Sequence, residues 1–454
     1  EWFHGGVQLN IAVTDYSFVS RPQAISMARR KGATDRAPLL SDDEPIDGYS
    51  TYTNISCQMK CQLGPVLPGA DSRKTDKLGD STVYDIVGVF VIAFDTRAGN
   101  TVEWWAPHDL DVSGIEFNAM TSGAHRVHTD FIYFKRKNCY GLSCFENMKV
   151  ESEQERGARM KSIGVLAKSY SLLHLHKEFL QKQVRQLLEK PGAYEDLLQF
   201  YLAYQTPPAL DTCLGTTYKS ICDGMHSMEI THPAGCFSQF LNFFGEKVFL
   251  LWKFALLKKR ILFFSPPPIG VICYRVYCTS TLVAHVYPDV ETCLCPPNFY
   301  VNVTDVDALA EQLSYVACTT EKIFETKQNL FDLFVDQQNL KVHSSLHERL
   351  LELSPADRMK YNHLLELRSK CQPLLAGDSD ATDESWFTGF FMAQNTQLFK
   401  ELLVASRSPE KLWTEEHMQR VGLDPHGDKL FLTELVERYG IDIVLITDSV
   451  CCPA

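Results

Sequence analysis

The chain contains residue types that could carry catalysis or bind a metal ion, but their spacing does not assemble a familiar site. His174 and His176 flank Leu175 in a helical stretch, where they would lie about 200° apart, so they cannot hold one metal ion together. Asp305 and Asp307 precede a helical segment, where acidic side chains cap free N–H groups and favour the helix dipole. We therefore interpret both pairs as structural.

The cysteines and the common catalytic motifs are equally uninformative. The 15 cysteines are scattered through segments rich in Leu, Phe and Tyr, which favours buried free thiols over a disulfide framework. Cys57 and Cys61 are three residues apart, and Cys293 and Cys295 one apart, so neither pair has the two-residue gap of a zinc knuckle. Phosphate-binding, dinucleotide-binding, esterase and zinc-protease motifs are all missing from the sequence. We expect no catalytic residue, no cofactor and no metal site.

Two segments are candidates for contact with a partner. One follows a predicted buried strand, at the edge where ligands and partners bind in open α/β sheets, and consists of Ser265, Pro266, Pro267 and Pro268. A rigid turn with proline at a helix start is the alternative interpretation. The other is Arg97, in a predicted hairpin turn with Gly99 and Asn100, where its side chain would project into solvent. A solvated turn residue is the alternative for Arg97.

Length, composition and charge limit the classes of protein. A chain of 454 residues exceeds the roughly 250–300 residues of a single core, so two or three domains are expected. Its 44 Lys and Arg against 56 Asp and Glu give a net charge of -12, which disfavours nucleic-acid binding. The most apolar stretch, residues 248–283, is interrupted by charged residues and prolines, so no transmembrane segment is expected. No secretory signal is recognised, which predicts a cytoplasmic protein.

The first part of the chain predicts a leader and an α+β domain. Residues 1–82 lack any periodicity and are expected to be a disordered leader, within which Met27 is a second plausible start, leaving 1–26 as an extension. Residues 83–206 predict a domain with five antiparallel strands and one long helix after them. Its expected strands are Ile86–Phe94, Thr101–Trp105, Asp130–Lys135, Tyr140–Phe145 and Met160–Leu166; its helices are Gly114–Met120 and Tyr170–Leu188.

The second part predicts a helix-wrapped α/β domain and a helical tail. Residues 207–228 are expected to be a linker, 229–345 the α/β domain and 346–454 the helical region. The α/β domain has expected helices Cys236–Phe244, Lys247–Leu257 and Gly270–Val283 and strands Arg260–Ser265, Tyr300–Val303, Tyr315–Thr319 and Asp332–Val335. The tail has expected helices Pro355–Gln372, Trp386–Ser406, Pro409–Arg420 and Leu430–Tyr439, an acidic loop Asp378–Glu384 and a last strand Ile441–Ile446.

This order of parts resembles the longin plus DENN architecture, and several short sequence segments are similar to those of DENN-domain proteins of the LCHN type. The similar segments include Val89–Phe94 with Arg97 and Asn100, Glu155–Ser162, Ile230–Cys236, Leu251–Leu257, Ser265–Val271, Tyr315–Phe324 and Gly422–Gly427. The resemblance extends over residues 83–453, and the leader resembles nothing beyond Ala37–Leu40. The Pro288–Pro297 loop also departs from the pattern.

The resemblance implies a guanine nucleotide exchange factor for a Rab-type small GTPase, gripped between the longin-like and DENN parts. Exchange needs no acid, base or metal, because a partner that binds the nucleotide-free GTPase more tightly must weaken GDP binding equally. Two alternatives stay open: a GTPase-activating protein that supplies Arg97 as an arginine finger, and a non-catalytic scaffold in vesicle trafficking. Peripheral recruitment to vesicle membranes is compatible with each of them.

Overall fold

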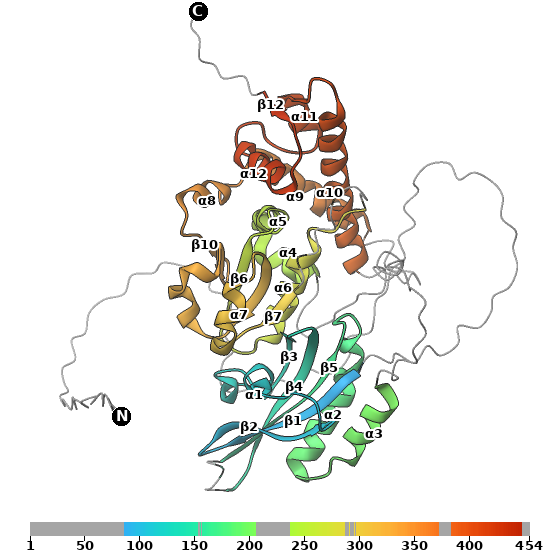
Figure 1. The fold of residues 1–454 in the computed structure, drawn as a ribbon, viewed down its shortest axis with the longest axis vertical. Helices are drawn as coiled ribbons and strands as arrows, with labels where there is room; N and C mark the ends of the chain where they lie inside the picture. The colour runs from blue at the N-terminus through green and yellow to red at the C-terminus, as the bar shows by residue number, and fades with distance from the viewer. Residues whose placement is uncertain are drawn as a thin grey trace, which may run out of the picture. The chain divides into compact units, whose positions relative to one another are not determined.

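The computed structural model describes residues 86–152, 155, 157–205, 237–286, 290, 295, 297–371 and 383–446. The expected leader and linker, and the residues after 446, lie outside these ranges. In the described part of the chain, ten strands form one mixed sheet in the order β10-β9-β6-β8-β7-β3-β4-β5-β1-β2 (Figure 1). The strands are β1 (Ile86–Asp95), β2 (Gly99–Ala106), β3 (Thr129–Arg136), β4 (Cys139–Lys149), β5 (Ala158–Ala167), β6 (Arg260–Phe264), β7 (Pro297–Tyr300), β8 (Tyr315–Thr319), β9 (Leu333–Asp336) and β10 (Asn339–Lys341).

Helices cover this sheet and build the C-terminal region. The α-helices are α1 (Ile115–Ala119), α2 (Lys177–Glu189), α3 (Glu195–Tyr204), α4 (Phe237–Phe244), α5 (Val248–Leu256), α6 (Gly270–Thr281), α7 (Val306–Ala310), α8 (Ser345–Leu350), α9 (Pro355–Cys371), α10 (Asp383–Arg407), α11 (Glu415–Arg420) and α12 (Lys429–Tyr439). Short 3-10 turns include η1 (Ala124–Arg126), η2 (Leu173–His176) and η5 (Val303–Asp305). None of the helices in the described ranges combines the length and apolar composition needed to cross a membrane.

Strands β1 to β5 are antiparallel, and helices pack on both of their faces. Successive side chains of a strand point to opposite faces. On β4, the Ser143 hydroxyl donates to the Ala119 carbonyl of α1 (3.2 Å), whereas the Glu146 carboxylate accepts from Arg185 of α2 (2.9 Å). Because these two β4 residues are an odd number apart, α1 and α2 cover opposite faces. Close packing is visible at Gly141, where an added Cβ would lie 2.2 Å from the ring of Phe134.

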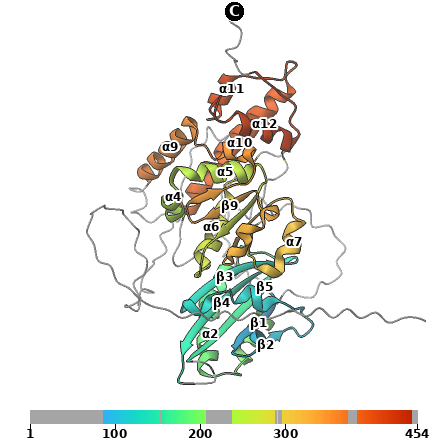
Figure 2. The ribbon, with the colours of Figure 1, turned by 90° about the vertical axis from the view of Figure 1, so that its left-hand side faces the viewer.

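Strands β6 to β9 are parallel to one another, and both of their faces are buried, whereas β10 pairs with β9 in the antiparallel sense. On β6, Ile261 and Phe263 belong to the main core, whereas Leu262 between them belongs to a second core with Leu309 and Phe324. This alternation requires an apolar layer on each side, which explains why these strands read as continuous hydrophobic runs. Figure 2 shows the result, with α6 and α7 on opposite sides of these strands.

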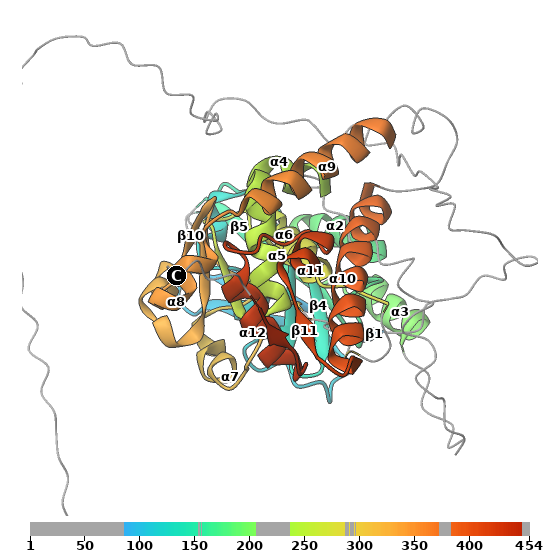
Figure 3. The ribbon, with the colours of Figure 1, turned by 90° about the horizontal axis from the view of Figure 1, so that it is seen from above.

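A buried network of charges joins α5 to the C-terminal helices, which surround α5 in Figure 3. Lys253 Nζ lies 2.5 Å from Asp357 Oδ2 and 2.5 Å from Asp428 Oδ1, and the three side chains are 2%, 0% and 0% exposed. Lys360 Nζ lies 3.2 Å from Asp357 Oδ1 and 4.4 Å from the centroid of the Trp252 ring. Two cations therefore balance two anions inside the core, and the Ser354 hydroxyl donates a further hydrogen bond to Asp428 Oδ2 (3.0 Å).

The mixed α/β fold class is confirmed, and so are both hairpins, the fifth strand and the helices α1, α4, α5, α6, α9 and α12. The expected helix Tyr170–Leu188 was wrong at its start, because η2 precedes α2. The helix expected over Pro409–Arg420 was also wrong. Its first half contains β11 (Leu412–Trp413), which pairs in parallel with β12 (Val444–Leu445), and Thr414 then caps α11. The last strand is consequently two residues long rather than six.

Three further expectations need correction. The strand placed at Tyr300–Val303 lies at Pro297–Tyr300, because Asn302 leaves the sheet to cap η5. The acidic loop ends earlier than expected, because its last two residues, Asp383 and Glu384, lie in α10, and the rest of it is outside the described residues. Helices α3 and α8 and strand β10 were not predicted. The domain boundaries stay predictions.

Candidate functional site

The Ser265–Pro268 loop connects β6 to α6 and contacts the region between α1 and β3. Ser265 N donates to the Thr319 carbonyl (3.2 Å), which continues the pairing of β6 with β8. Pro266 and Pro268 are exposed, whereas Pro267 is half-buried. A Cβ added to Gly123 would lie 3.4 Å from Pro267 Cγ, and Gly123 also has a positive φ of 85°. Glycine is therefore the residue that suits this close approach.

Asp130 of β3 caps the N-terminus of α6 immediately after this loop. Its carboxylate accepts from Ile269 N (2.6 Å) and from Gly270 N (3.0 Å), two of the amides that a helix leaves without an internal partner. The side chain is buried, and desolvation raises the pKa of Asp130 to about 6, although the hydrogen bonds from Ile269 and Gly270 act in the opposite direction. An antiparallel strand thus fixes the position of a helix of the parallel part.

Aromatic side chains pack beside this cap. Phe134 of β3 pairs in parallel with Tyr300 of β7, which joins the antiparallel and parallel strands into one sheet. Phe299 has a positive φ of 56° at a β-bulge and is fully buried, an uncommon conformation for a bulky residue. Its ring lies 5.3 Å from the ring of Tyr133 and 5.5 Å from that of Tyr170. The strained backbone of Phe299 is thus held by packing against aromatic rings of the antiparallel part.

We call these contacts the seam. It is defined by Asn118, Gly123, Asp130, Tyr133 and Phe134 on the antiparallel side and by Pro267, Ile269, Gly270, Phe299, Tyr300 and Asp305 on the parallel side. Asn118 Nδ2 of α1 donates to Asp305 Oδ2 (3.4 Å), and the same carboxylate oxygen accepts from Asn302 N (2.9 Å). Asp305 therefore belongs to the capping box of η5, whereas the predicted capping of the helix that starts at Val306 was wrong, because its side chain makes no capping hydrogen bond to α7. Burial raises the pKa of Asp305.

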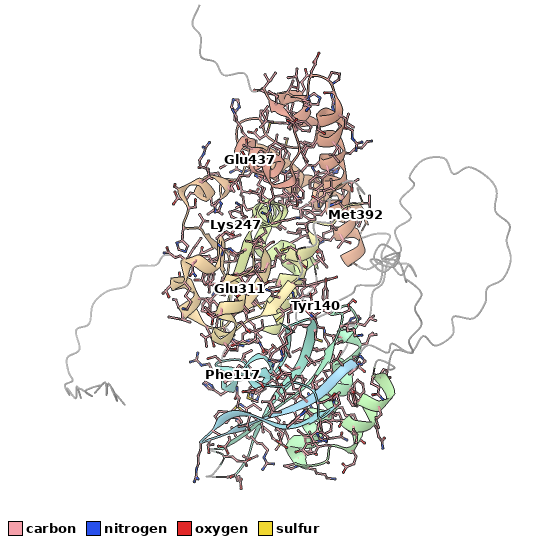
Figure 4. All side chains as sticks on the ribbon, viewed as in Figure 1. Phe117, Tyr140, Lys247, Glu311, Met392 and Glu437 are labelled. Carbon is pink, nitrogen blue, oxygen red and sulfur yellow. The ribbon has the colours of Figure 1, made fainter. Side chains whose placement is uncertain are left out.

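Large apolar side chains are exposed on the elements that flank the seam. Phe117 of α1 is 45% exposed, and Val303 of η5 is 50% exposed. Figure 4 marks Phe117 on its helix and Tyr140 at the start of β4. Phe117 directly precedes Asn118, and Val303 lies two residues before Asp305. Asn118 and Asp305 contact each other across the seam. Exposed apolar side chains gathered beside a polar contact are typical of a protein interaction surface.

Arg97 lies in the β1–β2 turn with its side chain exposed. The Asp95 carboxylate accepts from the Arg97 and Ala98 amides (2.7 Å each), which orders the turn. Asn100 Nδ2 donates to the Met120 carbonyl at the end of α1 (3.1 Å). The turn and the Ser265–Pro268 loop therefore both adjoin the α1–η1 segment. In the described part of the chain, no hydrogen bond or ion pair joins Arg97 to that loop.

The sequence analysis missed Asp130 and Phe117, although one of them left a signal. Ile115, Asn118 and Ala119 are buried on α1 at spacings of three and four residues, which leaves Phe117 outside the buried stripe. A helical projection of this segment would have identified Phe117 as exposed. Asp130 left no such signal, because its partners are 139 and 140 residues away in the sequence.

The candidate metal ligands of the described residues do not cluster. Among them, no group of three or more His, Cys, Asp or Glu side chains could hold a metal ion. His176 packs against the rings of Phe200 and Tyr204, and burial lowers its pKa to about 4. Cys273 Sγ lies 3.7 Å from Cys318 Sγ, and both are buried thiols outside any disulfide, as the sequence predicted for them.

Comparison with known proteins places these features in one family. The family model described as DENN domain-containing protein 11 matches residues 89–347. The DENN domain-containing protein 11 of Xenopus laevis is 50% identical over 440 residues, covering 94% of this chain and 100% of that protein. The protein of the same name from Rattus norvegicus is 49% identical over 388 residues, covering 83% and 85%. The chain therefore belongs to the DENN domain-containing protein 11 family.

Proposed function

We propose that this protein promotes release of GDP from a Rab-type small GTPase that docks on the surface flanking the seam. Membership of the DENN-domain family carries the proposal. A cytoplasmic location and recruitment to vesicle membranes belong to the same hypothesis, because the GTPase partner would be found there.

The geometry around the seam supports a mechanism of exchange without covalent chemistry. Exchange requires that the nucleotide-free GTPase be bound more tightly than its GDP form, which reciprocally weakens GDP. Such discrimination needs a rigid surface, and the Asp130 cap and the Phe299 packing fix the two sides of the seam relative to each other. The exposed Phe117 and Val303 supply apolar contact area on each side.

The test is release of fluorescent GDP from a panel of purified, GDP-loaded Rab proteins. Wild type should accelerate release from at least one member. Phe117→Ser should slow that release roughly tenfold or more, since loss of a central apolar anchor typically costs about 2 kcal/mol of binding. Leu202→Ser is the matched control, because Leu202 is an exposed leucine of α3 outside the seam. Failure of every Rab to respond would refute the proposed function.

GTPase activation is the second candidate, and one observation favours it. Arg97 is exposed at the tip of a turn whose backbone the Asp95 carboxylate orders, which is how an arginine finger must be presented. Single-turnover GTP hydrolysis by a Rab panel, with wild type and with Arg97→Ala and Arg97→Lys, separates the two functions. Acceleration that both variants abolish would establish activation. Equal capture of nucleotide-loaded and nucleotide-free GTPase, without either activity, would identify a scaffold.

A further inference from the structure

A cavity of ≈ 680 Å³ opens beside β4, away from the seam residues. Its origin lies in the lengths of the strands. Glu146 of β4 pairs with Thr129, the first residue of β3, and β4 then continues to Lys149 paired only with β5. The chain from η1 to β3 crosses beside this overhang instead of pairing along it. The space between the overhang and the crossing chain is the cavity, which we call the overhang pocket.

The overhang pocket is basic. Its lining includes His125, Arg126 and His128 from the crossing chain and Lys149 from the overhang, and Glu151 is the single acidic residue among the described residues that line it. This local excess of basic groups contrasts with the net charge of -12 for the chain. The net charge of the protein repels anions in general. A cavity with basic groups on two of its walls is therefore a place where an anionic ligand would bind.

The positions of these groups are set by the fold. Asn147 N donates to the His128 carbonyl (2.8 Å), and Asn147 Nδ2 donates to the His125 carbonyl (3.3 Å), which anchors the crossing chain to β4. Lys149 lies two residues beyond Asn147 and therefore projects from the same face of the strand. Arg126 is exposed on the anchored chain opposite it. Two cations thus face one cavity from separate elements whose backbones are hydrogen-bonded together.

We propose that the overhang pocket binds phosphomonoester groups carried on an inositol ring. Arg and Lys are the preferred partners of phosphate oxygens, and imidazole N–H groups add further donors. Four basic side chains around one cavity suit several phosphates on one small ring better than the single phosphate of a modified peptide. The volume lies within the range of small-molecule sites. The ligand is either a free inositol phosphate or the headgroup of a phosphoinositide lipid.

The pocket is also connected to the seam through the chain, since η1 follows directly after Gly123, which packs against Pro267. A lipid headgroup bound here would therefore hold the seam near a membrane surface, where a membrane-attached GTPase is concentrated. The inference does not rest on exchange activity, because binding of the ligand is measured without any GTPase.

The experiment compares the full chain with two double variants that lose equal charge. Arg126→Ser with Lys149→Ser removes both cations of the pocket, and Lys168→Ser with Lys190→Ser removes two exposed lysines elsewhere. One arm measures binding of inositol hexakisphosphate by calorimetry. The other measures flotation with phosphatidylcholine vesicles, either plain or containing a phosphorylated phosphatidylinositol. Thermal unfolding verifies that all three proteins are folded.

Wild type and the control variant should bind. The pocket variant should bind roughly 30-fold more weakly, because each cation lost near an anionic surface weakens binding about fivefold. Binding of inositol hexakisphosphate without binding to phosphoinositide vesicles identifies a free inositol phosphate, and binding to those vesicles identifies the lipid headgroup. No binding of either probe by wild type, or equal losses in the two double variants, would overturn the proposal.

Discussion

We predict that Asp130→Asn, in the buried cap at the seam, changes the free energy of unfolding with a sign that depends on pH. The Asp130 carboxylate uses two oxygens to accept from Ile269 N and Gly270 N, at 2.6 Å and 3.0 Å. Asparagine has nearly the same shape but one oxygen acceptor, so it keeps one of the two hydrogen bonds. It also carries no charge, so it avoids the cost of holding an ionised carboxylate away from water.

The magnitude follows from the pKa of Asp130, which is raised from 3.8 to about 6 by burial. Below the unfolded value of 3.8, the carboxyl is protonated in both states, and its contribution to stability is fully present. As pH rises through about 6, the folded state must release a proton that the unfolded state has already lost, so that contribution disappears. A difference of 2.2 units, from 3.8 to about 6, corresponds to about 3 kcal/mol. Asp130→Asn has no carboxyl group at this position, so its stability does not fall in this way as pH rises.

The free energy of unfolding is therefore measured by urea titration over the interval from about pH 4 to about pH 7 for wild type and Asp130→Asn. Relative to wild type, the variant should gain about 3 kcal/mol across this interval. Taking the difference cancels the other carboxylates, several of which have lowered pKa values and act in the opposite sense. Asp109→Asn, which removes one carboxylate at an exposed position, is the control for the loss of a negative charge.

Asp130→Ala separates the charge from the hydrogen bonds. It leaves both amides buried without an acceptor, at about 1–3 kcal/mol each, so it should be less stable than Asp130→Asn at every pH. Hydrogen exchange at the Ile269 and Gly270 amides gives a local measure of the same loss. The reasoning would be refuted if the difference in the free energy of unfolding between wild type and Asp130→Asn stayed constant with pH, or if it increasingly favoured wild type as pH rises. The hydrogen bonds to Asp130 would then outweigh its desolvation.

Three other changes test the packing. Lys253→Met should cost about 3–5 kcal/mol in urea unfolding, because it leaves two buried carboxylates with one remaining cation; a loss below about 1 kcal/mol would contradict this. Burial lowers the pKa of Lys177 to about 7, and its Nζ has no hydrogen-bond partner among the described residues, so Lys177→Met should stabilise the protein by up to about 5 kcal/mol near neutral pH. That gain should shrink as pH rises toward 10.5, the ordinary lysine value, and a gain independent of pH would count against it. Gly141→Ala should destabilise by about 1–3 kcal/mol because its Cβ meets Phe134 at 2.2 Å. Its control Gly389→Ala, with open space in helix α10, should stabilise by about 0.5–1 kcal/mol, and equal effects at both glycines would exclude the steric cause.

Local patterns predicted most of the elements but misplaced several boundaries. β-branched and aromatic runs identified β1 to β5. The errors occurred where a side chain ends an element through a specific hydrogen bond. Thr414 and His417 form a capping box that starts α11 late, and Asn302 caps η5 where a strand was expected to continue. Such contacts depend on single side chains, to which hydrophobic periodicity is insensitive.

The sequence by itself determined the fold class and the family, because these depend on local patterns and on short sequence segments that relatives share. It also located the Ser265–Pro268 loop at the end of a buried strand. Only the tertiary structure decided what surrounds that loop: the Asp130 cap, the Phe299 packing and the exposed Phe117 beside them. The physical reason is that these groups meet across more than a hundred residues of chain, as Asp130 and Ile269 do at a separation of 139. A local pattern specifies which face of an element is apolar, whereas the partner of a buried polar group is set by how distant elements pack.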